Sequence, residues 1–140
     1  MIQAFIAGTP IPQGSKVAYN RGGRCIIAES NKKLPAWRKL VKEKLEEANA
    51  GCEPLSGEVS LQVIFFMPRP KTVTRLFPTT KPDLDKLIRA INDSATDAGI
   101  LEDDSQVIEI VAYKFYQDEQ NPVGVFVAYD KLSGVSAHRF

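Results

Sequence analysis

The alternation of apolar and polar residues predicts where this chain forms strands. Residues 58–67 read EVSLQVIFFM, an alternating run rich in β-branched and aromatic residues, which is typical of a strand. Similar patterns predict further strands over 2–7, 25–28, 106–116 and 123–129. Residues 16–24 are rich in basic residues and glycine, so we expect a basic loop there.

Apolar residues at helical spacing predict two main helices. The first begins near Pro35, which suits an opening turn, and stops near Gly51. Trp37 lies on its apolar face, and we interpret it as a core anchor rather than a platform for stacking bases. The second helix covers about 83–97, with Gly99 as its C′ residue.

The order of these elements favours an α+β fold, because strands and helices mix without regular βαβ repetition. We expect a small mixed sheet and two main helices in one domain over 1–140, with an irregular tail over 131–140. A composition of 44% hydrophobic and 25% charged residues excludes a largely disordered chain. No apolar run approaches the roughly 20 residues of a membrane span, and the N-terminus lacks a signal-peptide pattern. We therefore expect a soluble, cytoplasmic protein without a membrane partner.

The histidine and cysteine content excludes several kinds of chemistry. The one histidine, His138, lies near the C-terminus, and Cys25 and Cys52 lie in segments of different character. Structural zinc needs about four N/S ligands at defined spacing, so we do not expect it. A Ser-His-Asp or Cys-His mechanism would rest on that terminal histidine. Catalysis therefore has to use carboxylates, lysine, arginine or a metal with oxygen ligands.

Charge is distributed unevenly along a chain whose net charge is only +1. Residues 1–44 carry nine basic and two acidic residues, and residues 67–81 carry four basic and no acidic ones. Residues 82–109 carry eight acidic and two basic residues. This distribution fits scattered solvated charges, and it also fits a phosphate-binding surface around an acidic metal site. Charge alone leaves both interpretations open.

Two acidic segments carry the candidate chemistry: KPDLDKLIR at 81–89 and EDDSQ at 102–106. Three carboxylates and several waters form an ordinary oxygen shell for Mg²⁺. Two residues on a helix differ by about 200°, so Asp83 and Asp85 converge only if Asp83 is an extended N-cap residue. Pro82 favours that arrangement because it ends the preceding loop. Plain helix capping by Asp83 and Asp85 explains the same positions.

Arg89 follows Asp85 by four residues and can reach the same side of the helix. The simpler interpretation is an i,i+4 ion pair, which contributes little to stability. The functional interpretation is a fixed cation that stabilises the charge developing on an attacked phosphate. The sequence leaves both open.

These segments resemble the RusA family of Holliday junction resolvases. The similarity covers about 81–114 and rests on KPDLDKLIR, Asp93, GILEDDSQV and Lys114, with a weaker match in the basic N-terminal stretch. The resemblance implies a dimeric endodeoxyribonuclease that depends on Mg²⁺, with Mn²⁺ as a substitute. Such an enzyme resolves four-way DNA junctions by paired cuts in recombination and repair. It also implies a bacterial or phage origin and action at the nucleoid.

The resemblance also assigns roles to individual residues. Asp83, Asp85 and Asp104 match the family's metal-binding aspartates, and Asp93, Asp103 and Lys114 match supporting positions. Arg89 stands where relatives often carry a catalytic lysine, and a guanidinium keeps the charge of that lysine but not its geometry or proton chemistry. Lys86 stands where relatives often carry asparagine. The basic residues expected to bind the DNA backbone are Lys16, Arg21, Arg24, Arg69, Lys71, Arg75, Lys81 and Lys86.

The second helix separates the three aspartates that the resemblance assigns to the metal. About 15 residues at 1.5 Å rise span roughly 22 Å, with Asp83 and Asp85 at one end and Asp104 beyond the other. Two such helices packed antiparallel about a two-fold axis bring Asp104 of one chain to Asp83 and Asp85 of the other. We therefore predict composite active sites completed across a homodimer.

Three other functions remain open at this point. The first is a non-catalytic dimer that binds branched DNA, with the aspartates as cap and turn residues. The second is a metal-dependent nuclease for other branched DNA, and the third is an enzyme that processes free nucleotides. Mg²⁺-dependent nicking of a synthetic four-way junction, compared with a panel of branched DNAs and free nucleotides, separates them.

Overall fold

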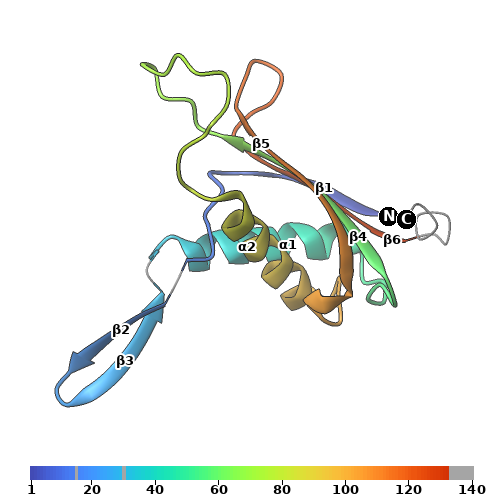
Figure 1. The fold of residues 1–140 in the computed structure, drawn as a ribbon. Coiled ribbons are helices and arrows are strands. Elements are labelled where there is room, and N and C mark those ends of the chain that lie inside the picture. Colours follow the sequence, from blue (N-terminus) through green and yellow to red (C-terminus); the bar gives the residue numbers. More distant parts are fainter. Residues whose placement is uncertain (15, 30, 133–140) are drawn as a thin grey trace.

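The computed structural model describes residues 1–14, 16–29 and 31–132, and it contains two α-helices and a mixed four-stranded sheet (Figure 1). This arrangement confirms the predicted α+β class. In chain order the elements are β1 (Ile2–Ala7), β2 (Lys16–Arg21), β3 (Arg24–Glu29), α1 (Leu34–Asn49), β4 (Val59–Met67), α2 (Leu84–Asp97), the 3₁₀ helix η1 (Asp104–Gln106), β5 (Val107–Tyr116) and β6 (Gly124–Lys131).

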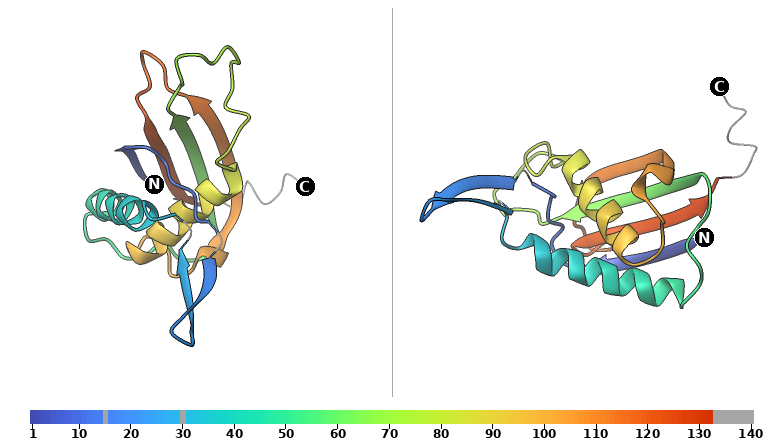
Figure 2. Two further views of the ribbon diagram at one scale, coloured as in Figure 1. Left: turned by 90° about the vertical axis from the view of Figure 1, so that its left-hand side faces the viewer. Right: turned by 90° about the horizontal axis from the view of Figure 1, so that it is seen from below.

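The main sheet has the strand order β1-β6-β4-β5. β6 pairs antiparallel with β1 and β4, whereas β4 and β5 are parallel. Both helices cover the same face of this sheet, as Figure 2 shows from below. Alternate residues of the central strand β4 are fully buried, which is why its sequence alternates. β1 and β5 are left as the two edges.

The core lies between the helices and this sheet face. Trp37 of α1 is buried, which confirms its interpretation as a core anchor. A Cβ on Gly8 would lie 3.2 Å from the Trp37 ring, and Gly8 has a φ of +143°. Glycine therefore lets the chain after β1 pass closely over the indole.

The expectation of a basic loop over 16–24 is wrong. β2 and β3 form an antiparallel hairpin in which Arg21 pairs with Arg24 and Lys16 with Glu29. Gly22 and Gly23 make the turn with φ values of +59° and +82°, and a Gly-Gly pair is typical of a two-residue hairpin turn. The short strand expected over 25–28 is the middle of β3. The hairpin projects away from the main sheet (Figures 1 and 2).

Several predicted element ends need small corrections. α1 begins at Leu34 and ends at Asn49, with Ala50 already in a left-handed conformation before Gly51. Gly99 has a φ of +77° and follows the C-cap of α2, as predicted. β6 continues to Lys131, so the irregular tail does not begin there, and 133–140 lie outside the described residues. Within the described chain, neither helix combines the length and apolar character needed to span a membrane.

Candidate functional site

The first turn of α2 presents two carboxylates. Asp83 is the N-cap residue, with φ −71° and ψ 140°, so it has the extended conformation that the sequence predicted. Its side chain accepts no capping hydrogen bond, and its Oδ2 lies 3.6 Å from Nζ of Lys86. Asp85 is exposed in the same turn. Simple capping therefore does not account for Asp83, whose exposed carboxylate pairs with Lys86 instead.

Lys114 of β5 fixes the backbone just before Asp83. Its ammonium group donates hydrogen bonds to the carbonyl oxygens of Thr80 at 2.9 Å and Pro82 at 2.8 Å. On the other side, the backbone N–H of Gln13 donates to the carbonyl of Lys86 at 2.9 Å. The start of α2 is thus attached both to the sheet and to the segment that follows β1.

The two aspartates of the second acidic segment, Asp103 and Asp104, differ in their contacts. Asp103 is the N-cap residue of η1, and its carboxylate accepts from the backbone N–H of Ser105 at 3.0 Å. Hydrogen bonds from Ser105 hold the pKa of Asp103 below its ordinary value. Asp104 is exposed, and its carboxylate accepts no hydrogen bond within the described part of the chain.

Gln106 anchors this turn to the body of the protein. Its Oε1 accepts from the backbone N–H groups of Glu102 and Asp103, which completes a capping box. Its Nε2 donates to the carbonyls of Leu55 at 2.8 Å and Gly57 at 3.1 Å. Asp103 and Gln106 therefore build the turn, and the turn presents Asp104 to solvent.

Asp93 lies within electrostatic reach of Asp104. Burial raises the pKa of Asp93, the positive charges of Arg38 and Arg89 oppose that rise, and the negative charge of Asp104 adds to it. Asp93 is only partly buried.

Tyr129 and Asn92 join this region, and the sequence interpretation missed their contact. The buried Tyr129 hydroxyl donates to Oδ1 of Asn92 at 2.7 Å, across 37 residues of sequence. Burial raises the pKa of Tyr129 far above its ordinary value, and Asp104 and Asp93 add to the rise. The hydroxyl therefore stays protonated and remains a donor.

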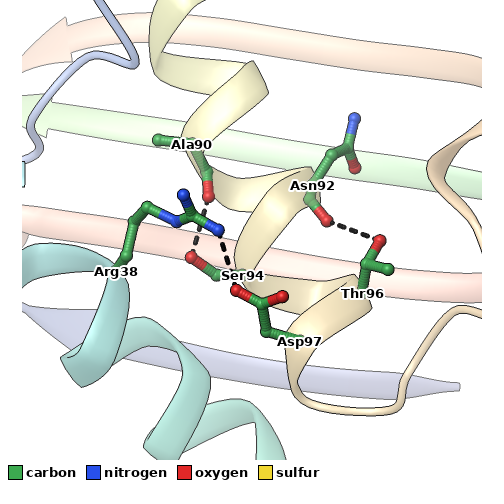
Figure 3. A network of polar contacts seen from close by, with 6 residues as sticks. All are labelled: Arg38, Ala90, Asn92, Ser94, Thr96 and Asp97. Carbon is green, nitrogen blue, oxygen red and sulfur yellow. Dashed lines mark hydrogen bonds and ion pairs between the residues drawn. The ribbon is translucent and has the colours of Figure 1, made fainter. Parts of the chain in front are cut away.

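The C-terminal half of α2 makes one ion pair with α1 and two side-chain hydrogen bonds within itself (Figure 3). Arg38 of α1 donates to the carboxylate of Asp97 at 2.8 Å. The hydroxyl groups of Ser94 and Thr96 donate hydrogen bonds to the backbone carbonyls of Ala90 and Asn92, respectively, within the helix. The Arg38–Asp97 pair thus links the end of α2 to α1.

Arg89 is exposed one turn after Asp85. Among the ion pairs of the described residues, none joins Arg89 to Asp85, so the simple i,i+4 pair is not formed. The positive charge of Arg89 instead acts on Asp93, whose pKa it lowers against the larger effect of burial. The guanidinium is therefore free to meet an external anion.

A basic cleft of about 750 Å³ opens beside Asp83. Its lining includes the exposed lysines Lys32, Lys33, Lys81 and Lys86 together with Asp83. Lys81 and Lys86 were among the predicted DNA-binding residues, whereas Lys32 and Lys33 were missed. Their segment just precedes α1, and only folding brings it to the start of α2.

The other predicted DNA-binding residues fall into two groups. Arg21 and Arg24 are exposed at the hairpin tip, and Lys71 is exposed after β4; for Lys16 only the backbone is described. Arg69 and Arg75 contact their own chain. Nε of Arg75 donates to the Tyr116 hydroxyl at 3.0 Å, and the Arg69 guanidinium lies 5.0 Å from the centre of the Tyr116 ring.

The predicted metal ligands do not meet within one chain. Across the described residues, no group of three or more His, Cys, Asp or Glu side chains is placed to hold a metal ion. Asp83 and Asp85 lie at the start of α2, and Asp104 lies beyond its end at η1 (Figure 1). The donors themselves suit Mg²⁺, because all three are exposed carboxylates without a capping hydrogen bond. One chain thus carries such carboxylates in two separate places.

Comparisons with known proteins relate this chain to a nuclease family. A family model described as Endodeoxyribonuclease RusA matches residues 7–128, a range that contains both acidic segments and the hairpin. The chain is also 29% identical over 133 residues to "Uncharacterized protein YqaN" of Bacillus subtilis (strain 168). That alignment covers 84% of this chain and 89% of the relative.

Proposed function

Because the chain belongs to the Endodeoxyribonuclease RusA family, we propose that it resolves four-way DNA junctions by Mg²⁺-dependent phosphodiester hydrolysis. Recombination and repair are the processes that generate such junctions. The observation that carries the proposal is the exposed carboxylate of Asp83, which caps no helix N–H, pairs with Lys86 and stands beside a lysine-lined cleft. A carboxylate with that surrounding is suited to hold a cation against a phosphate.

Asp83, Asp85 and Asp104 are the residues that would hold the metal. Mg²⁺, or Mn²⁺ in its place, would polarise the scissile phosphate and lower the pKa of the attacking water. The carboxylates alone repel DNA, so the acidic site would attract a backbone phosphate only with the metal ion bound.

The protein's own cations bind and orient the DNA. Lys32, Lys33, Lys81 and Lys86 line the cleft next to Asp83, and their ammonium groups neutralise backbone phosphates without reading bases. Arg21 and Arg24 extend the basic surface along the hairpin. Binding should therefore weaken steeply as salt concentration rises.

Arg89 acts on the reacting phosphate itself. Its guanidinium lies one helical turn after Asp85 and has no ion-pair partner within the described chain. A fixed positive charge there stabilises the negative charge that builds up during hydrolysis. A guanidinium supplies charge rather than a proton, so Arg89 replaces the lysine of the family resemblance in charge only.

The active enzyme is a homodimer with two composite sites. Asp83 and Asp85 of one protomer and the partner's Asp104 complete each ligand set, because a single chain keeps them apart. Two sites related by a two-fold axis match the symmetry of a four-way junction and allow paired cuts.

A cleavage assay on a synthetic four-way junction tests this function. We expect cutting with Mg²⁺, none with a chelator, and none by Asp85→Asn, which should still bind the junction. Glu47→Gln is the matched control, since it neutralises an exposed carboxylate on α1. Cutting by purified Asp85→Asn would refute the site. Binding without cutting would favour a non-catalytic DNA-binding dimer, and preference for flaps or plain duplex would change the substrate.

A further inference from the structure

Aromatic side chains follow one another across the sheet face that the two helices leave open. Val63 and Phe65 of β4 belong to the core on the helix side, so Phe66 between and beyond them points to the other face. We call the rings on this face and in the adjoining segment the aromatic row: Phe5, Phe66, Phe77, Tyr113 and Phe115.

The rings of the aromatic row are close together and partly open to solvent. Ring centroids are 6.2 Å apart for Phe77 and Phe115, 6.4 Å for Phe115 and Phe66, and 6.5 Å for Phe66 and Phe5. Tyr113 is stacked on Phe115 at 5.3 Å. Phe77 is 56% exposed, and Tyr113 is 49% exposed. Neighbouring exposed rings of this kind form a surface on which other flat rings can stack.

A pocket of about 450 Å³ opens at one end of the aromatic row. It lies between the segment 68–82 and the turn after β5, which both project beyond the sheet (Figure 1). Its lining combines three rings with side chains that donate and accept hydrogen bonds: Phe66, Phe77, Phe115, Arg69, Gln117 and Asn121. A flat ring with polar edges, such as a nucleobase, can stack on these rings and bond to these groups.

The charges beside the pocket suit the backbone of a nucleic acid. Residues 67–81 carry four basic residues and no acidic ones, and Arg69, Lys71 and Arg75 among them are exposed. The Arg69 guanidinium lies 5.0 Å from the centre of the Tyr116 ring, and Nε of Arg75 donates to the Tyr116 hydroxyl at 3.0 Å. These two contacts keep both cations near the pocket, where they can bind phosphates.

Asp118 also lines the pocket, but its carboxylate is engaged in the turn itself. It accepts hydrogen bonds from the backbone N–H groups of Gln120 and Asn121, both at 2.8 Å, and from the Asn121 side chain. These bonds hold the pKa of Asp118 below its ordinary value. The carboxylate therefore serves to shape the turn that forms one wall of the pocket.

The pocket and the carboxylate site are carried by the same elements. Phe77 precedes Asp83 by six residues, an extended span of at most about 20 Å. On β5, Lys114 bonds to the carbonyl of Pro82 next to Asp83, whereas the following residue, Phe115, lines the pocket. One DNA strand is long enough to occupy both places.

From these observations we infer that the aromatic row is a second DNA-binding surface, which takes unpaired bases by stacking. Phe77 and its pocket hold a base, and the cations of residues 67–81 bind the phosphates of the same strand. This surface is distinct from the lysine-lined cleft beside Asp83. The choice of DNA rests on the proposed function, and the inference adds a preference for the unpaired nucleotides that branched DNA can expose.

Binding of two single strands in the presence of a chelator tests whether bases are held. Anisotropy of a labelled oligothymidylate is compared with that of an abasic strand of the same length, which has the same phosphates but no bases. We expect the abasic strand to bind at least about fivefold more weakly, because base stacking on aromatic side chains is lost. Equal affinities for the two strands would overturn the inference.

Substitutions of Phe77 locate the stacking. Phe77→Leu keeps an apolar side chain without a ring, so it should weaken oligothymidylate binding at least about fivefold and leave abasic-strand binding unchanged. Phe77→Trp should bind as wild type, and oligothymidylate should quench its added fluorescence over that of the buried Trp37. Ile108→Ala is the matched control, since Ile108 is a 61% exposed aliphatic residue outside the aromatic row.

Two other results would contradict this assignment. Wild-type affinity in Phe77→Leu would show that no ring is needed there. A changed oligomeric state of Phe77→Leu in sedimentation, with unchanged oligothymidylate binding, would make the surface a protein contact. If wild type distinguishes the two strands but cuts no four-way junction, the proposed function fails and the surface stands. If it cuts junctions and binds both strands equally, this inference alone fails.

Discussion

Asp83 and Asp103 occupy the same position relative to two different helices, and they are used differently. Both are N-cap residues with extended backbone, at ψ 140° and ψ 146°. The carboxylate of Asp103 caps η1 through the N–H of Ser105, whereas that of Asp83 caps nothing and lies near Lys86. One aspartate is part of the architecture, and the other is available for chemistry. A capping position in a sequence does not reveal which of the two it is.

The largest effect that tests this contrast is the loss of cleavage in Asp83→Asn. We expect junction cutting to fall below detection, because a metal ligand is lost, while Tm and junction binding change little. The measurement is single-turnover cleavage beside a thermal melt. A large drop in Tm would mean that Asp83 stabilises the fold after all, and the contrast with Asp103 would disappear.

Arg89→Ala should give the next largest effect. Removing one group that stabilises transition-state charge typically costs about 10²–10³-fold in rate, so turnover should fall by that amount with junction affinity nearly unchanged. Arg89→Lys keeps the charge and should recover part of the rate. If turnover is unchanged in the alanine variant, Arg89 has no part in the reaction and is a solvated surface residue.

Asp103→Ala should have the opposite effect to Asp83→Asn: it should lower stability and leave cleavage intact. Loss of the cap should lower Tm by a few degrees, and cutting should persist at temperatures where the protein is folded. Asp103→Asn should restore Tm, because asparagine caps nearly as well. The pKa of Asp103 is lowered in the folded state, so its contribution is present above the unfolded pKa and is lost as the pH falls through the lower folded value. The difference in Tm between wild type and Asp103→Ala should therefore become smaller at acid pH.

The sequence was most informative where one local rule was sufficient. Pro82 before Asp83 predicted the extended N-cap, and the acidic segments identified the family that the comparison confirms. The Gly22-Gly23 turn was misjudged because the surrounding charges suggested a loop, although the glycine pair is itself a hairpin signal.

Contacts between distant segments could not be predicted from the sequence. Lys32 and Lys33 reach the cleft beside Asp83 only through folding, and Tyr129 meets Asn92 across 37 residues. The hydrophobic periodicity of the sequence does not predict such contacts, because the packing of the helices on the sheet determines them. For the same reason the roles of Asp104 and Asp93 depended on the resemblance alone and remain predictions.

The smallest effect concerns Asp93, which is neither a cap nor fully exposed. Burial raises its folded pKa, so folding favours the protonated form. That stability is fully present below the unfolded pKa, near the ordinary value of 3.8, and is lost as the pH rises through the folded pKa. Asp93→Asn carries no charge to desolvate, so its Tm at pH 7 should exceed that of wild type by about 1–2 °C.

The Tm advantage of Asp93→Asn over wild type should become smaller as the pH falls toward 4, because wild-type Asp93 is then protonated and also uncharged. Asp97→Asn is the control, since Asp97 is exposed and pairs with Arg38 at 2.8 Å, and its loss should not raise Tm. Thermal melts across this pH range provide the measurement. A lower Tm for Asp93→Asn at pH 7 would show that Arg38 and Arg89 outweigh the burial of Asp93, and that Asp93 stabilises the fold as Asp103 does.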